Sequence, residues 1–103
     1  MTEHTAARNP ERRPTPPREL LLSTVLPATN LSKAEFARRL GVSRQSVYDL
    51  LDGRQRVSPE MAVRLGALFG NGPQLWYGMQ SNCDLWDAAR AVDTSAIPPL
   101  EPA

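Results

Sequence analysis

The sequence has few of the residues that enzymes use for catalysis. Its 103 residues include one histidine, His4, and one cysteine, Cys83. A thiol nucleophile or a zinc site needs histidine, cysteine or carboxylate partners at a suitable spacing, and neither residue has them. A glycine-rich loop for phosphate is also missing. We therefore expect no enzymatic activity, no catalytic residue, no metal site and no cofactor.

The lack of cysteine pairs and of long apolar runs indicates the cellular compartment of the protein. A single cysteine cannot form an intrachain disulfide, which fits a reducing cytosol. No apolar run approaches the roughly 20 residues that cross a bilayer, and the N-terminus lacks the apolar core of a secretory signal. The net charge is only +1, so overall charge indicates neither nucleic acid nor membrane. We expect a cytoplasmic protein with no membrane partner.

Prolines and polar residues concentrate at the two ends of the chain. Residues 1–16 are polar and contain three of the ten prolines, and residues 93–103 contain three more. Such segments bury too little apolar surface to offset the entropy of ordering. We therefore predict two disordered tails around one all-α domain of five helices at residues 17–92. The arginines of the first tail are interpreted as solvated, with phosphate or RNA contact as the alternative.

The most informative segment is residues 33–52, whose pattern is typical of a helix-turn-helix. Ser32 can cap the first helix, with Glu35 at the capping-box position. Gly41 suits the turn, because a helix end favours positive φ there. Ser43 can cap the second helix. The inward positions are all apolar or small: Phe36, Ala37, Leu40, Val42, Val47, Leu50 and Leu51.

The second helix of such a motif enters the major groove of DNA. Arg44 and Gln45 lie at its start, and these residue types pair with guanine and adenine edges through two hydrogen bonds. We predict that these two read bases. Ser43, Ser46 and Asp49 lie nearby. The alternative is a helical hairpin with a solvated polar face, but the agreement of core, glycine and caps favours DNA.

Three basic residues flank this helix and are predicted to contact phosphate: Lys33, Arg54 and Arg56. The segment 33–56 carries six basic and three acidic residues, so it is more basic than the chain as a whole. For Arg54 and Arg56 the alternative is solvated loop charge. Tyr48 can stack on a sugar or a thymine methyl, or pack against Arg44.

Prolines also mark the other helices. Pro17 is predicted to open the first helix and Pro27 to end it. Ser58 and Pro59 form a cap and first residue for the fourth helix. Pro73 starts the last helix, which we expect to run to about Ala91.

The last helix, about 73–91, repeats large apolar residues at three- and four-residue steps. Such residues are more often core than ligand-binding. A domain this small has a limited core, however, and part of this face can be buried in a dimer. A homodimer also suits DNA, because two recognition helices one turn apart read a palindrome. The predicted interface residues are Trp76, Met79, Cys83 and Trp86.

With these elements placed, the chain resembles the HigA-type antitoxins of the phage-repressor (Xre/Cro) helix-turn-helix family, over about residues 16–90. Three residues depart from the family pattern, namely Arg18, Met79 and Cys83. The matching stretches are Pro17-Arg18-Glu19-Leu20-Leu21, Asp52-Gly53, Ser58-Pro59-Glu60-Met61-Ala62-Val63-Arg64-Leu65, Pro73-Gln74-Leu75-Trp76 and Met79-Gln80-Ser81-Asn82-Cys83-Asp84-Leu85. Arg64 and Asp84 match family positions, and we expect them to form an ion pair between the last two helices.

The resemblance implies a bacterial antitoxin that binds a HigB-like, RelE-type mRNA-cleaving toxin. It also implies a homodimer that binds double-stranded operator DNA and represses its own operon, and so sits at the nucleoid. Two alternatives stay open: a stand-alone regulator with no toxin, and an interaction protein that has lost DNA binding. Arg44 and Gln45 disfavour the second.

Overall fold

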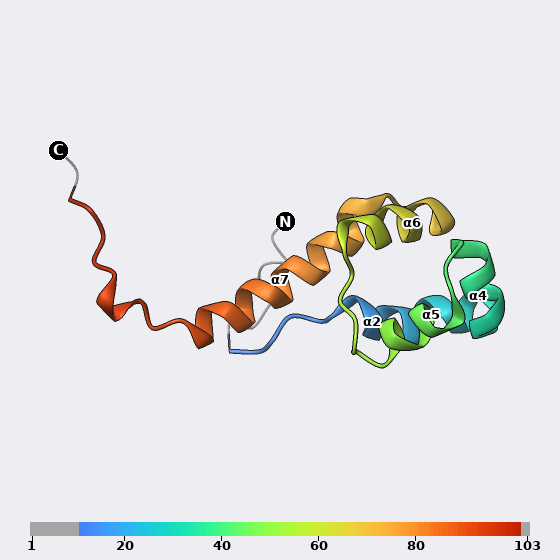
Figure 1. Cartoon of the computed structure of the whole chain (residues 1–103), viewed down its shortest axis with the longest axis horizontal. Helices are drawn as coiled ribbons and strands as arrows, with labels where there is room; N and C mark the ends of the chain where they lie inside the picture. Colours follow the sequence, from blue (N-terminus) through green and yellow to red (C-terminus); the bar gives the residue numbers. More distant parts are fainter. Residues whose placement is uncertain (1–10, 102–103) are drawn as a thin grey trace.

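The computed structural model describes residues 11–101, and helices joined by loops are its only regular secondary structure over this range, with no strand. The helix-turn-helix lies at one end, and α7 extends away from it and ends in an arm (Figure 1). Within the described range, no helix has the length and apolar character to cross a membrane. The helical elements in chain order are α2 (Pro17–Leu20), η1 (Leu21–Val25), α3 (Leu26–Thr29), α4 (Lys33–Leu40), α5 (Arg44–Leu51), α6 (Pro59–Phe69), α7 (Pro73–Ala91) and η2 (Thr94–Ala96).

The first helix passes through Pro27, so the prediction that this proline ends it was wrong. The elements α2, η1 and α3 follow one another without a break from Pro17 to Thr29. The middle turn is a π-helix, in which the Leu26 N–H donates to the Leu21 carbonyl five residues back. This wider turn precedes a residue that has no N–H and whose ring crowds a regular helix. The helix ends instead at Asn30, whose φ of 59° is left-handed.

The predicted caps of the helix-turn-helix are confirmed. The Ser32 hydroxyl accepts a hydrogen bond from the Glu35 N–H at 3.1 Å, and Ser43 accepts one from the Ser46 N–H at 3.0 Å. Gly41 has a φ of 77°, in the region that favours glycine. The Glu35 carboxylate pairs with Arg38. Both helices therefore start and stop where the sequence indicates.

A chain of aromatic rings in the core joins α4, α6 and α7. Phe36 of α4 contacts Phe69 of α6, and Phe69 contacts Trp76 of α7, each pair with ring centroids 5.9 Å apart. The buried Trp76 indole N–H donates to the Asn71 side chain at 2.9 Å, so its polar atom is satisfied. This core fixes α4 and α5 against α6 and α7.

Residues 13 and 14 lie against α7. The Arg13 guanidinium donates two hydrogen bonds of 2.8 Å to Asp87, and this contact lowers the pKa of that carboxyl. The Cys83 thiol donates to the Pro14 carbonyl at 3.2 Å. The disordered tail assigned to residues 1–16 stays a prediction, and its residues 1–10, with His4 and Arg8, lie outside the described range.

Cys83 should react slowly with thiol reagents in the folded protein. Its side chain is fully buried beneath this segment, and burial raises the pKa of the thiol, so little thiolate forms at neutral pH. We expect Asp87→Asn, which removes the carboxylate partner of Arg13, to speed the reaction with Ellman's reagent severalfold. Glu60→Gln, at a distant exposed carboxylate, is the control. Equal rates in all three proteins would contradict this role for residues 13 and 14.

Candidate nucleic-acid interface

The outward face of α5 carries the side chains predicted to read DNA. Val47, Leu50 and Leu51 turn inward and are buried, and this leaves Arg44 and Gln45 exposed at the start of the helix. Arg44 makes no hydrogen bond or ion pair with any residue of the described range. Its guanidinium is therefore available to a ligand.

Asp49 holds two of the other predicted contacts in place. Its carboxylate accepts hydrogen bonds from the Gln45 amide at 2.9 Å and from Arg54 at 3.1 Å. Arg54 also pairs with Asp52 at 3.0 Å. Asp49 thus orients Gln45 on the helix and Arg54 just beyond it. Because both side chains are restricted before any ligand binds, less conformational entropy is lost on binding.

Lys33 and Tyr48 lie together at the junction of α4 and α5. The Lys33 ammonium is 5.6 Å from the centre of the Tyr48 ring, a cation–π distance. Within the protein the ring therefore pairs with Lys33 and not with Arg44, while stacking on a sugar or a thymine methyl stays a prediction. The tyrosine packs beneath Lys33 and keeps part of its ring exposed. Ser46 is half-buried and accepts a hydrogen bond from the Ser43 hydroxyl.

Arg56 is attached to α7 through a small polar network. Arg56 pairs with Asp84, Asp84 accepts from the Gln80 amide at 3.0 Å, and the Gln80 oxygen accepts from the buried Val57 N–H at 2.8 Å. The Arg56 side chain nevertheless remains about half exposed. The network fixes the loop after the recognition helix. The sequence placed Gln80 in a family-like stretch but gave it no role, although a polar residue between Trp76 and Cys83 on the apolar face of α7 signals a buried partner.

Gln80→Met should destabilise the protein and loosen this loop. Methionine fills a similar volume but cannot accept the Val57 N–H, and an unpaired buried donor costs about 1–3 kcal/mol. Urea unfolding measures the loss. Gln74→Met is the matched control, because Gln74 is exposed on the same helix. A Gln80→Met protein as stable as this control would contradict the buried hydrogen bond.

Arg64 does not pair with Asp84, so that expectation was wrong. It donates to the Leu40 carbonyl at 2.8 Å and to Glu60 on its own helix. The last carbonyls of a helix lack partners within it, and the C-terminus of α4 lies closer to Arg64 than Asp84 does. Arg64 therefore ties α6 to the turn before the recognition helix.

The four residues predicted for the dimer interface are placed differently from one another. Trp76 and Cys83 are fully buried within the protomer, and Met79 and Trp86 are half-buried. Trp86 stacks beneath Arg90, whose guanidinium carbon is 3.4 Å from the ring centre. The large apolar residues that α7 exposes are instead Leu75, Tyr77 and Leu85.

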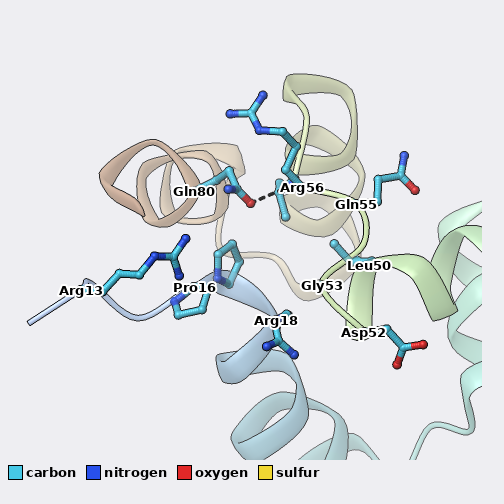
Figure 2. Close-up of a pocket in the computed structure, with 11 residues that line it drawn as sticks. Arg13, Pro16, Arg18, Leu50, Asp52, Gly53, Gln55, Arg56 and Gln80 are labelled. Carbon is cyan, nitrogen blue, oxygen red and sulfur yellow. Dashed lines mark hydrogen bonds between the residues drawn. The ribbon is translucent and has the colours of Figure 1, made fainter. Parts of the chain in front are cut away.

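A cavity of about 260 Å³ lies where the N-terminal segment, the end of α5 and α7 meet. Figure 2 shows Arg13, Arg18 and Arg56 around it, with the hydrogen bond between Gln80 and the Val57 N–H as a dashed line. Arg18 donates to the Leu51 carbonyl at 3.2 Å. Each arginine is engaged within the protein, and Arg18 is the one that braces the C-terminal end of the recognition helix.

Comparisons with known proteins agree with this geometry. A family model described as a helix-turn-helix domain matches residues 11–75. The chain is 34% identical to antitoxin HigA-1 of Vibrio cholerae, over 86% of this chain and 84% of that protein. It is 32% identical to the uncharacterized HTH-type transcriptional regulator YddM of Escherichia coli, over 75% of this chain and 82% of the regulator. Pseudomonas aeruginosa antitoxin HigA, solved with the higBA promoter, superposes with a TM-score of 0.76 at 34% identity, covering 87% and 98% of the two chains.

Proposed function

Since this chain belongs to the helix-turn-helix family that includes the HigA-type antitoxins, we propose that it is an antitoxin and repressor. It binds operator DNA upstream of its own operon as a homodimer and neutralises a HigB-like, mRNA-cleaving toxin. The family is non-enzymatic. Its place of action is the bacterial cytoplasm, at the nucleoid.

The observation that carries the DNA-binding half is the exposed start of α5. Arg44 is free to pair with a base edge, and Asp49 already orients Gln45 beside it. Lys33 comes before α5 in the chain, Arg54 and Arg56 follow it, and we assign these three to phosphate. Base reading by Arg44 and Gln45, with phosphate contacts from the other three, is the arrangement typical of this motif. The Pseudomonas antitoxin solved with its promoter supports the same use of the fold.

The antitoxin half is supported by the relatives. The match to HigA-1 spans most of both chains, including α7, which extends beyond the helix-turn-helix itself. The uncharacterized regulator YddM, similar over a comparable length, favours a second candidate: a DNA-binding regulator that has no toxin partner. The two functions share the α5 surface and differ only in the protein partner.

Co-expression with the neighbouring gene separates the two functions. The tagged chain is purified from cells that also express its neighbour, and the eluate is tested on the upstream DNA. A small basic partner that co-purifies, loses its mRNA-cleaving activity in the complex and leaves the DNA shift intact supports the antitoxin. DNA binding with no partner, and a neighbour that does not arrest growth when expressed alone, would leave the stand-alone regulator.

A further inference from the structure

An apolar groove lies between α6 and the start of α7. This cavity, of about 390 Å³, is lined by Pro59, Ala62, Val63, Pro73, Tyr77 and Gly78, with Gln74 as the polar residue at its edge. Val63 is 58% exposed and Tyr77 is 40% exposed. Large apolar side chains left open around one cavity are typical of an interaction site.

The opposite end of α7 carries a segment of matching chemistry. Residues 92–101, here called the C-terminal arm, run away from the body of the protein (Figure 1). Ile97 and Leu100 are 64% and 96% exposed. Pro98 and Pro99 between them fix φ, so this stretch loses little conformational freedom on binding. Grooves lined by aromatic side chains bind extended, proline-rich segments of this kind.

The register of α7 shows which groove the arm can reach. The groove of the same chain lies at the start of α7, whereas the arm leaves from the end of α7 and points away from that groove. Leu85, exposed in mid-helix, lies seven residues after Gly78 and seven before Val92, so all three share one face. If two α7 helices pack antiparallel with a two-fold axis at Leu85, Gly78 of one faces Val92 of the other. Each arm then begins beside the partner's groove.

We propose that the C-terminal arm of one protomer docks in the α6–α7 groove of a second copy of the chain. The inference rests on the homodimer of the proposed function and identifies its surface. A stable interface takes about 800 Å² from each partner, which one face of a single helix does not supply. Arm exchange adds further apolar side chains to the buried interface: Val63 and Tyr77 of one chain, and Ile97 and Leu100 of the other. Because α7 leads away from α4 and α5 (Figure 1), both recognition helices stay uncovered.

Sedimentation equilibrium of the full chain tests the proposal. The double variant Ile97→Asp/Leu100→Asp and the groove variant Val63→Asp should each raise the dimer dissociation constant about tenfold or more, because apolar burial is lost. The three sites are exposed in the protomer, so its fold should survive, and circular dichroism checks this. Leu22→Asp, at an exposed apolar residue of η1 outside the groove, is the control and should not change dimerisation.

The outcomes separate this proposal from the function on which it rests. A native chain that is monomeric at every concentration overturns both the homodimer and arm exchange. A native dimer that neither variant weakens overturns arm exchange alone, as does a variant that keeps the dimer and loses only toxin binding.

A disulfide test identifies the owner of the arm. A Val63→Cys chain is mixed with an Ile97→Cys chain of different mass, and the native chain, with only buried Cys83, is the control. A mixed disulfide is expected. A disulfide that forms only when one chain carries both cysteines would show that the arm folds back on its own groove.

Discussion

Replacing Gly66 with alanine is expected to cost about 3 kcal/mol or more of folding stability, although alanine is the better helix former. A Cβ at this position would lie 2.3 Å from the Gly72 carbonyl carbon and 2.5 Å from the Pro73 nitrogen. Both are backbone atoms of the turn into α7, so no side chain can rotate away. Overpacking of this kind typically costs 1–3 kcal/mol and occasionally more, against a total stability of roughly 5–15 kcal/mol.

Urea unfolding followed by circular dichroism measures this effect, with Gly78→Ala as the matched control. Gly78 is also helical, but nothing lies within 4 Å of a Cβ built there. Within the protomer helix propensity then acts alone, and the control should unfold at an equal or higher urea concentration at the same protein concentration. If both variants are equally stable, α6 does not approach the start of α7 as closely as the structure indicates.

Replacing Arg44 with alanine is expected to weaken binding to operator DNA roughly 10- to 100-fold, while binding to unrelated DNA changes little. A bidentate arginine–guanine pair contributes about 1–3 kcal/mol of discrimination, whereas a phosphate contact weakens all sequences alike. Arg44 is the first residue of α5 and has no partner within residues 11–101, so its loss leaves no buried group unpaired. Any change in affinity therefore reports on DNA directly.

Fluorescence anisotropy on the upstream DNA and on a scrambled duplex, at one fixed salt concentration, measures both affinities. Arg39→Ala is the control, because it removes the same charge from the exposed face of α4. It should reduce binding to both duplexes by the same small factor. Equal losses on both duplexes for Arg44→Ala would make Arg44 a phosphate contact and remove it from base reading.

The helix-turn-helix was predictable because its signals are local. Ser32, Gly41 and Ser43 act on backbone groups within four residues of themselves, and the helix bounds follow from them. The same holds for Ser58, whose hydroxyl accepts the Met61 N–H, and for Pro73 at the start of α7. Cap chemistry and helical periodicity fix such elements without knowledge of the rest of the chain.

The features that the sequence did not reveal depend on contacts between distant segments. The periodicity of α7 placed Trp76 and Cys83 on one face, but only the packing of α6 and of residue 14 shows that this face is buried within the protomer. The role of Gly66 depends on a turn that approaches it in space. The helix continues through Pro27 because the turn before it widens, and no local signal predicts that adjustment.

Protection of the upstream DNA from hydroxyl-radical cleavage tests the central claim most directly. If a homodimer reads its operator with two copies of α5, the native protein should protect two half-sites related by a two-fold axis. Their centres should lie about one helical turn, or a small multiple of it, apart. Arg44→Ala should abolish the pattern at concentrations where Arg39→Ala preserves it. Uniform protection without half-sites, or protection that Arg44→Ala leaves intact, would contradict operator recognition through α5.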